Sequence, residues 1–332
     1  MSVAEAEWAA ALEVVCSAED VVLMCHVGPD GDALGSMLGV GIALRRRGAN
    51  VRASYDDSPF VVPARLRFLP GQELLVPPNE VPARPAVALT FDTGSIDRLG
   101  ALVAPAEAAD ALVVVDHHTT NTMYGTHNVV DPDAAATSLV GLELVDRLGV
   151  ELDADIAAGL YTGLTTDTGS FRFAATTPAV HEIAARLLRT GIAHDRIARE
   201  VFDTRSIGYL RLLGAALDRA ELDVNAVGGR GLVSTVVPAA DRARFEVTVD
   251  EVEAVIGTLR ITQEAEVAVV CKETDNATYA VSMRSKGAVD VARVAVALGG
   301  GGHLYAAGYT SMADFPTTMQ QLRAELDAAA GG

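Results

Sequence analysis

Three apolar runs of this chain, at residues 21–25, 86–91 and 111–115, are each followed by aspartate or histidine. The side chains that follow them are His26, Asp30, Asp32, Asp92, Asp116, His117 and His118. Imidazole and carboxylate groups are common metal ligands. Because ligands of open α/β sheets bind beyond the carboxyl ends of the strands, one site could collect all of these groups.

Each aspartate also has a structural interpretation. Asp32 could cap a helix, since a carboxylate accepts hydrogen bonds from backbone amides at a helix start. Asp92 could cap a short helix that follows it, and Asp116 could orient a neighbouring histidine. Asp167, taken alone, is a turn aspartate just past a helix. A cap explains one aspartate, but it does not explain the histidine and two aspartates that together follow the first run.

The candidate metal ligands offer oxygen and nitrogen atoms and include no cysteine. They are His26, Asp30, Asp32, Asp92, His117 and Asp167. This mixture favours Mn²⁺ ahead of Zn²⁺. Six ligands are too many for one catalytic ion with open positions, and they suit two ions about 3.5–4 Å apart that share a carboxylate. Such pairs stabilise the attacking and leaving oxygens of a phosphoryl transfer, so the ligands favour hydrolysis of a phosphate ester.

The elements that must position these groups predict an α/β fold. Strands are expected over 21–26, 51–55, 86–91 and 111–115, and helices over 3–18, 32–47, 137–148, 153–164 and 177–189. The strand–helix–strand order at the start is a βαβ unit, which predicts a parallel sheet. Five prolines between residues 70 and 85 indicate a surface loop, with a domain linker as the alternative.

The pattern changes in the second half of the chain. A helical, more charged stretch at 191–222 is expected to connect a catalytic domain, 1–190, to a second domain, 223–332. Strands are expected there over 231–237, 267–272 and 278–285, and helices over 249–259 and 289–298. The expected fold is therefore α/β, with a parallel-sheet domain, a smaller α/β domain and an active-site cleft between them.

Composition narrows the classes of partner. The chain has 332 residues, of which 50% are hydrophobic, but no apolar run that predicts a membrane span or an export signal. Its three cysteines form no disulfide or metal motif, so a cytoplasmic location is expected. The formal net charge of -18 argues against binding of long nucleic acid, which needs a basic surface. A nucleic-acid substrate is therefore expected to be short. Alternatively, the negative charge serves only to keep the protein soluble.

Taken together, these motifs resemble those of the DHH phosphoesterases. The matching residues are His26, Pro29, Asp30, Asp32, Asp92, Asp116, His117, His118 and Asp167. The segment 299–308, Gly-Gly-Gly-Gly-His-x-x-Ala-Ala-Gly, resembles the glycine motif of the associated DHHA1 domain. All of the motifs occur in order, and the two-domain length resembles the NrnA type, bacterial nucleases of very short RNA that also remove the 3′-phosphate of PAP.

The resemblance implies a role for each site residue. One ion would bind His26, Asp30 and Asp92, and the other would bind Asp32, Asp92, His117 and Asp167. Asp92 would bridge the ions, His118 would face the scissile phosphate as a donor or acid, and Asp116 would lie behind the ligands. The expected cofactor is a pair of Mn²⁺ ions, with Mg²⁺ or Co²⁺ as alternatives.

The resemblance also implies the partners. The expected substrates are nano-RNA, linear or cyclic dinucleotides such as pApA and cyclic di-AMP, and PAP, and the expected assembly is a homodimer. RecJ-type exonucleases share the catalytic motifs but are usually longer. Family II pyrophosphatases have a different second domain. A non-catalytic sensor of cyclic dinucleotides is the alternative from another functional class.

The second domain is expected to bind the substrate's phosphate. The expected binding residues are Arg284, Ser285, Lys286, Gly301, Gly302 and His303. Glycines let the backbone approach a phosphate closely, and successive amides form an anion-binding nest. A glycine run by itself is more often a flexible loop, so this expectation depends on the neighbouring cations. Tyr305 could stack on a base or pack in the core.

Overall fold

A computed structural model describes residues 3–274, 276 and 278–331, which form two compact units. The first unit ends at Thr204, and the second begins at Arg205. The stretch 191–222 is divided between them, because α7 (His194–Ala198) belongs to the first unit and α8 (Ile207–Asp218) to the second. Within the described residues, no helix combines the length and the apolar character needed to cross a membrane.

The first unit is built on a sheet of five parallel strands. They are β1 (Asp20–Cys25), β2 (Asn50–Ser54), β3 (Val87–Phe91), β4 (Ala111–Asp116) and β5 (His127–Val130). Their order is β2-β1-β3-β4-β5, which confirms the predicted parallel sheet and adds β5, which was not predicted. The order reverses between β1 and β3, and ligands of such sheets bind outside the carboxyl ends at this reversal.

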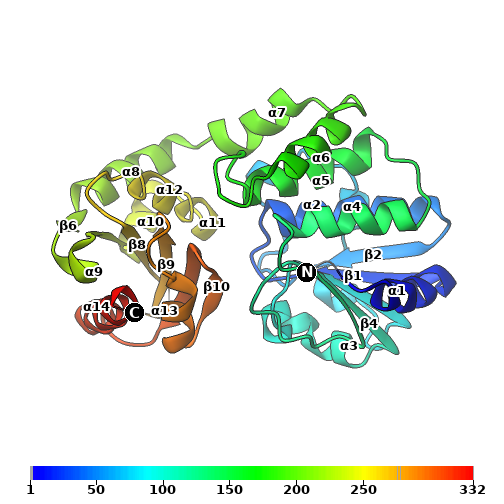
Figure 1. Ribbon diagram of the computed structural model, residues 1–332, viewed down its shortest axis with the longest axis horizontal. Coiled ribbons are helices and arrows are strands. Elements are labelled where there is room, and N and C mark those ends of the chain that lie inside the picture. The colour runs from blue at the N-terminus through cyan, green and yellow to red at the C-terminus, as the bar shows by residue number, and fades with distance from the viewer. Residues whose placement is uncertain (1–2, 275, 277, 332) are drawn as a thin grey trace. The chain divides into compact units, whose positions relative to one another are not determined.

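Helices cover both faces of this sheet. They are α1 (Glu5–Ser17), α2 (Gly31–Arg46), α3 (Val103–Glu107), α4 (Thr137–Arg147), α5 (Ala154–Asp167) and α6 (Pro178–Leu188). Figure 1 shows α2 and α4 on one face and α3 on the other. Successive residues of β1 enter the two cores in turn, Leu23 the first and Met24 the second. Because both faces are buried, the strands are continuous apolar runs, which made them recognisable in the sequence.

Two helices of the first unit approach each other closely enough to bring their ends together. A Cβ on Gly35 of α2 would collide with the carbonyl oxygen of Gly159 on α5, and a Cβ on Gly159 would collide with the carbonyl of Gly35. Both positions therefore require glycine. The contact allows the start of α2, with Asp32, and the end of α5, with Asp167, to lie at one site.

Among the described residues, four 3₁₀ helices and a π-helix, η5, complete the first unit. They are η1 (Ala64–Leu66), η2 (Gln72–Leu74), η3 (Pro78–Glu80), η4 (Ile96–Leu102) and η5 (Arg199–Asp203). The proline-rich region 70–85 includes two of them and lies inside the first unit. This confirms that it is a loop and shows that the linker alternative was wrong.

The second unit contains a mixed sheet of six strands. They are β6 (Glu221–Asp223), β7 (Leu232–Val237), β8 (Val267–Glu273), β9 (Tyr279–Ser285), β10 (Gly301–His303) and β11 (Ala306–Ser311), in the order β10-β11-β9-β8-β7-β6. The glycine run expected to bind phosphate continues into β10, which pairs with β11 in a hairpin. Pairing is parallel between β7 and β8 and antiparallel elsewhere.

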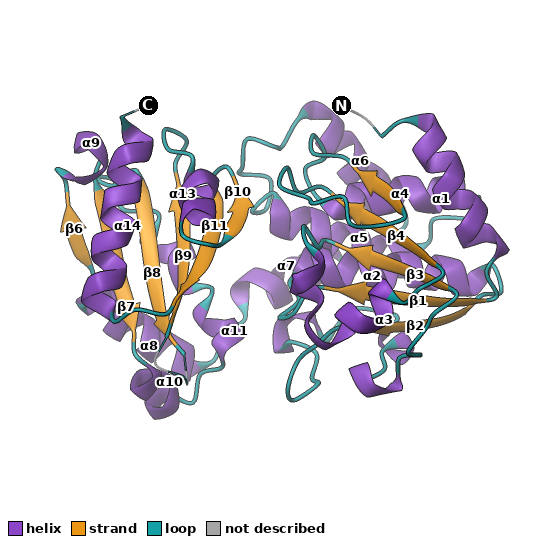
Figure 2. Cartoon of the chain, turned by 90° about the horizontal axis from the view of Figure 1, so that it is seen from below, coloured by secondary structure: helices purple, strands orange, loops and turns teal. Residues whose placement is uncertain are grey.

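Helices cover this sheet as well. They are α9 (Ala226–Gly229), α10 (Ala239–Phe245), α11 (Val249–Val252), α12 (Val255–Leu259), α13 (Val291–Ala297) and α14 (Phe315–Ala330), in addition to α8. Figure 2 shows α13 and α14 on one face of the sheet. The helices α8 and α12 pack on the opposite face. The single helix expected over 249–259 is therefore two short helices, α11 and α12.

Candidate metal centre

The loop after β1 supplies the first groups of the site. His26 follows β1 directly and is buried. Asp30 is the N-cap of α2, because its side chain accepts hydrogen bonds from the amides of Asp32 and Ala33, each at 3.0 Å. The capping role considered for Asp32 therefore belongs to Asp30. Asp32 is the second residue of α2, and its carboxylate does not cap this helix.

Asp32 is held by the start of another helix. Its carboxylate is fully buried and accepts hydrogen bonds from the backbone amides of Thr137 at 2.6 Å and Ser138 at 2.9 Å. The Ser36 hydroxyl donates a further bond at 3.1 Å. The amides at the start of α4 thus fix this anion, as helix N-termini commonly do. Sequence reasoning missed Thr137 and Ser138, although a Thr-Ser pair opening a helix was a usable signal.

Asp92 occupies the centre of the cluster. Its carboxylate lies 3.6 Å from Nε2 of His26, 3.6 Å from Nε2 of His117 and 2.9 Å from the hydroxyl of Thr137, which donates to it. Its φ of 55° is a left-handed conformation that a non-glycine residue adopts at a cost of about 1–3 kcal/mol. The N-cap of η4 is Ser95, so the capping interpretation of Asp92 was wrong.

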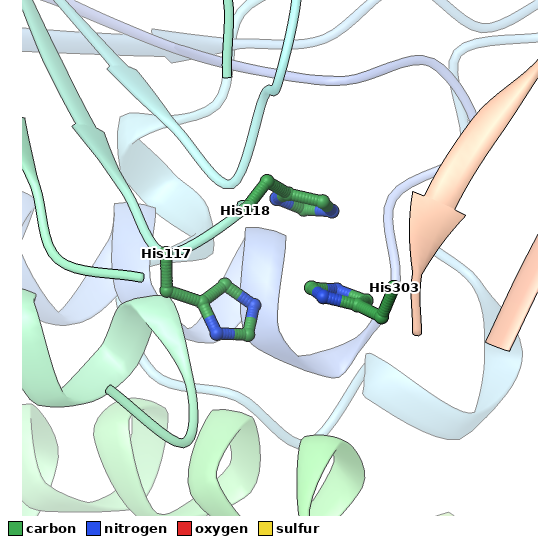
Figure 3. Close-up of side chains that lie close together, drawn as sticks. All are labelled: His117, His118 and His303. Atoms are coloured by element: carbon green, nitrogen blue, oxygen red, sulfur yellow. The ribbon is translucent and has the colours of Figure 1, made fainter. Parts of the chain in front are cut away.

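Two adjacent histidines leave the end of β4 in different directions (Figure 3). Their ring planes lie 72° apart. Nδ1 of His117 donates to the carbonyl of Ala134 at 3.0 Å, which places Nε2 3.2 Å from the carboxylate of Asp167. A backbone acceptor on one ring nitrogen fixes the tautomer and presents the other nitrogen as a ligand.

His118 is oriented by a short hydrogen-bonded chain. Its Nδ1 lies 2.8 Å from Oδ1 of Asp116, which is fully buried. The amide side chain of Asn121 donates to Oδ2 of the same carboxylate at 2.5 Å. This geometry confirms that Asp116 orients a neighbouring histidine. Sequence reasoning missed Asn121, three positions after His118, because the candidate residues were selected as histidines and aspartates and asparagine is neutral.

Burial and charge oppose each other in the cluster. Burial would lower the pKa of His117, but the hydrogen bond and charge of Asp167, with further carboxylates, raise it well above its usual value. Burial and the charges of Asp167 and Asp92 raise the pKa of Asp32 well above its usual range. Burial raises the pKa of Asp167 to about 6, against the hydrogen bond from His117. At Asp92 the effect of burial is outweighed by the interaction with His26 and the charges of three histidines, so its pKa lies below the usual range.

Potential ligand atoms of the first unit converge in three groups, each with its atoms within 4.8 Å of one another. The groups are His26, Asp30 and Asp92; Asp32, Asp92 and His117; and Asp92, Asp116 and His118. Asp92 belongs to all three, and Asp167 joins through His117. Carboxylates this close repel one another unless cations lie among them, and oxygen and imidazole donors suit a divalent ion such as Mn²⁺. The donor set therefore fits the expected metal.

The expected phosphate-binding residues lie in the second unit. Arg284 of β9 and His303 of β10 both pair with Ala306 of β11, so their side chains project from the same face of the sheet. Ser285 is buried and donates to Glu266 at 2.8 Å, and the Lys286 ammonium donates to the carbonyl of Thr262. These last two side chains thus make contacts within the fold.

The glycine run has two kinds of position. A Cβ on Gly302 would lie 2.6 Å from the carbonyl oxygen of Ala306, and a Cβ on Gly300 would lie 2.5 Å from Cβ of Tyr309. The hairpin itself therefore requires these two glycines. A Cβ on Gly301 would meet no atom within 4 Å, so packing does not explain that glycine. Tyr305 lies at the hairpin tip and is 39% exposed, which excludes core packing for its ring.

Two family models match the chain. Residues 20–164 match the N-terminal domain of the DHH family, and residues 228–331 match the DHHA1 domain. A relative from Thermus thermophilus, described as a bifunctional oligoribonuclease and PAP phosphatase NrnA, is 36% identical over 290 residues, which cover 87% of this chain and 83% of the relative.

Solved structures share the fold. An exopolyphosphatase-related protein from Bacteroides fragilis superposes with a TM-score of 0.85 at 23% identity, covering 99% of this chain and 97% of that protein. RecJ from Thermus thermophilus, solved in complex with Mn²⁺, has a TM-score of 0.51 at 16% identity, and the match covers 98% of this chain but 54% of RecJ.

Proposed function

The chain belongs to the DHH phosphoesterase family, in the branch that carries a DHHA1 domain, and on this premise we propose that it hydrolyses short oligoribonucleotides and PAP. The observation that carries the proposal is the convergence of histidine and aspartate groups on the shared carboxylate of Asp92. A protein that only binds its ligand has no need to bury several carboxylates close together, which costs free energy of folding. The match covers 83% of the NrnA relative but 54% of RecJ, and this difference in length favours the NrnA type over a RecJ-like exonuclease.

Six side chains of the first unit would hold two divalent ions, with Mn²⁺ as the preferred metal. His26, Asp30 and Asp92 would bind one ion, and Asp32, Asp92, His117 and Asp167 the other. Bound there, two ions would lower the pKa of a water molecule and neutralise charge on the phosphate. Asp32 and His117 contribute rigidity, since backbone groups fix both side chains before any metal binds.

His118 is placed to act on the substrate itself. Asp116 accepts a hydrogen bond from its Nδ1, so Nε2 is the ring nitrogen that would contact a phosphate oxygen or the leaving group. Burial would lower the pKa of His118, but the hydrogen bond and charges of Asp116 and Asp92 raise it. A protonated imidazole can donate to the oxygen that departs from phosphorus. We therefore assign His118 as the acid and Asp116 as its positioning residue.

The substrate is expected to be short. The chain has 26 lysines and arginines against 44 acidic residues, so it lacks the positive field that long nucleic acid requires. On the second unit, Arg284 and His303 share one sheet face, and the open space around Gly301 leaves room for a phosphate. These groups would bind the terminal phosphate of a linear dinucleotide such as pApA, including the one formed when the ring of cyclic di-AMP is hydrolysed. They would bind a phosphate of the mononucleotide PAP in the same way.

A substrate panel tests this function. The purified protein is incubated with Mn²⁺ and, separately, with pApA, cyclic di-AMP, PAP, a trinucleotide RNA and pyrophosphate, and products are resolved by chromatography. Release of AMP from pApA and PAP is expected, with no turnover after the metal is chelated. Tight binding of cyclic di-AMP without any product would favour a sensor, and orthophosphate from pyrophosphate alone would favour a pyrophosphatase. The homodimer implied by the family stays a prediction, for which light scattering is the measurement.

A further inference from the structure

One arginine of the first unit lies beside the acidic cluster without an acidic partner. Arg98, in η4, is exposed, and its guanidinium lies 3.5 Å from Nδ1 of His26. Other arginines of this unit are paired: Arg84 with Asp110, and Arg45 with Glu73. Within the described residues, Arg98 makes no ion pair with an aspartate or glutamate.

The contact between Arg98 and His26 is not a hydrogen bond in which His26 accepts, so it uses none of the guanidinium's N–H donors. Nδ1 of His26 lies 2.9 Å from the carbonyl oxygen of Val27, and a carbonyl can only accept, so Nδ1 carries the hydrogen. It cannot then accept a hydrogen bond from Arg98. A guanidinium has five N–H donors in a fixed planar arrangement that matches two oxygens of a phosphate.

The backbone holds Arg98 in place before any ligand arrives. Its carbonyl accepts the amide of Val27 at 2.9 Å, and its own amide donates to the carbonyl of Ser95 at 3.1 Å. Two residues on, Gly100 adopts a φ of 58°, and the next amide, of Ala101, donates to Asp56 at 2.8 Å. The loop after β3 is therefore fastened to the loop after β1, so the backbone of Arg98 is held beside the cluster.

We propose that Arg98 binds the paired non-bridging oxygens of the scissile phosphate on the His26 side of the cluster. This inference rests on the proposed function, since it assigns a further substrate contact in the same site. An arginine that served only solubility or loop structure would need no position beside a candidate metal ligand. A phosphate ester is the ligand class, because its paired oxygens match the guanidinium and its charge complements a cation that no carboxylate of the described residues neutralises.

Kinetics of Arg98→Gln and Arg98→Lys test the contact. With Mn²⁺ and pApA, Arg98→Gln is expected to raise KM roughly 10- to 100-fold, the loss typical of a hydrogen bond to a charged group. Arg98→Lys keeps the charge but loses the paired geometry, so a smaller rise of about fivefold is expected. Arg84→Gln makes the same charge change at the opposite edge of the sheet, before β3, and is expected to leave KM unchanged.

Metal affinity separates substrate binding from support of His26. The dissociation constant for Mn²⁺, measured by calorimetry on the full chain, is expected to change less than about twofold in Arg98→Gln, since neutral His26 keeps its Val27 contact. If Mn²⁺ binding weakens in parallel with the rise in KM, Arg98 positions His26 and the proposal is wrong. An unchanged KM also overturns it.

A binding assay keeps this inference distinct from the proposed function. AMP, a phosphate monoester, is titrated into the Mn²⁺-loaded wild type and Arg98→Gln. Absence of turnover by the wild type would reject the proposed function, while weaker AMP binding by Arg98→Gln alone would still support the phosphate contact. Equal AMP binding by both proteins would reject the contact whether or not the wild type is an enzyme.

Discussion

At the scale of single residues, the cluster consists of groups that would release protons when a metal ion binds. Asp92 carries a left-handed backbone and accepts from several donors, which is the strain expected where function fixes a conformation. His117 holds its proton more tightly than an ordinary histidine, because its pKa is raised, and the pKa of Asp167 lies near the physiological range. In the metal-free protein, protons therefore occupy sites that a divalent ion would take.

Proton release on metal binding follows from these pKa shifts. The pKa of His117 is raised, so at pH 7 the metal-free protein holds a proton there that a bound ion must displace. Mn²⁺ affinity should therefore rise with pH, by about tenfold per pH unit for each proton that the ion displaces. As pH drops through the pKa of Asp167, about 6, this carboxylate also protonates and binding weakens further. Calorimetry in buffers of different ionisation enthalpy measures the release, and a heat independent of buffer would contradict the account.

The sequence allowed the six ligand candidates to be named because each follows an apolar run or lies in a motif. The structure brings these side chains to one place, although their roles as ligands stay predictions. The groups that support them were not recognised. Thr137, Ser138 and Asn121 act through backbone amides or a neutral side chain, and such contacts depend on which distant segments meet, which local residue types do not reveal.

At the scale of elements, the site depends on the contact between α2 and α5. Gly163 of α5 lies against Asp32 and Ser138, and a Cβ there would collide with the Asp32 carboxylate. The helices are thus spaced by glycines so that an aspartate at the start of one can reach the end of the other. The buried strands were predicted well because both faces are apolar. The strands β5, β6, β10 and β11 were missed, since none of them is a continuous apolar run in the sequence.

Gly163→Ala tests this spacing. The added methyl should displace the Asp32 carboxylate, weaken Mn²⁺ binding by about tenfold or more, and destabilise the fold by about 1–3 kcal/mol through overpacking. Gly214→Ala, in α8, is a matched change because a Cβ there meets no atom within 4 Å. It should stabilise its helix by about 0.5–1 kcal/mol and leave metal binding intact. Normal Mn²⁺ affinity in Gly163→Ala would show that the helix contact does not position Asp32.

At the scale of the whole molecule, chemistry and recognition are assigned to separate units. The candidate metal ligands all lie in the first unit, and Arg284 and His303 lie in the second. An acidic chain can act on an anionic substrate in this way, because bound cations and a few arginines compensate the charge locally. The same arrangement favours substrates with few phosphates over long nucleic acid.

Arg284→Ala tests the division of roles. Loss of this cation should raise KM for pApA by about tenfold, the cost of one hydrogen bond to a charged group, while kcat and Mn²⁺ affinity stay near those of the wild type. Arg293→Ala removes an exposed cation from α13 of the same unit and should change none of these values. A fall in kcat with unchanged KM in Arg284→Ala would assign this arginine to the chemical step instead.

The central claim is that two ions share Asp92, and anomalous diffraction from crystals soaked in Mn²⁺ tests it most directly. The account predicts two manganese peaks about 3.5–4 Å apart, with a carboxylate oxygen of Asp92 between them, and the loss of both peaks in Asp92→Asn. A single peak, peaks distant from Asp92, or two peaks that persist in Asp92→Asn would contradict it.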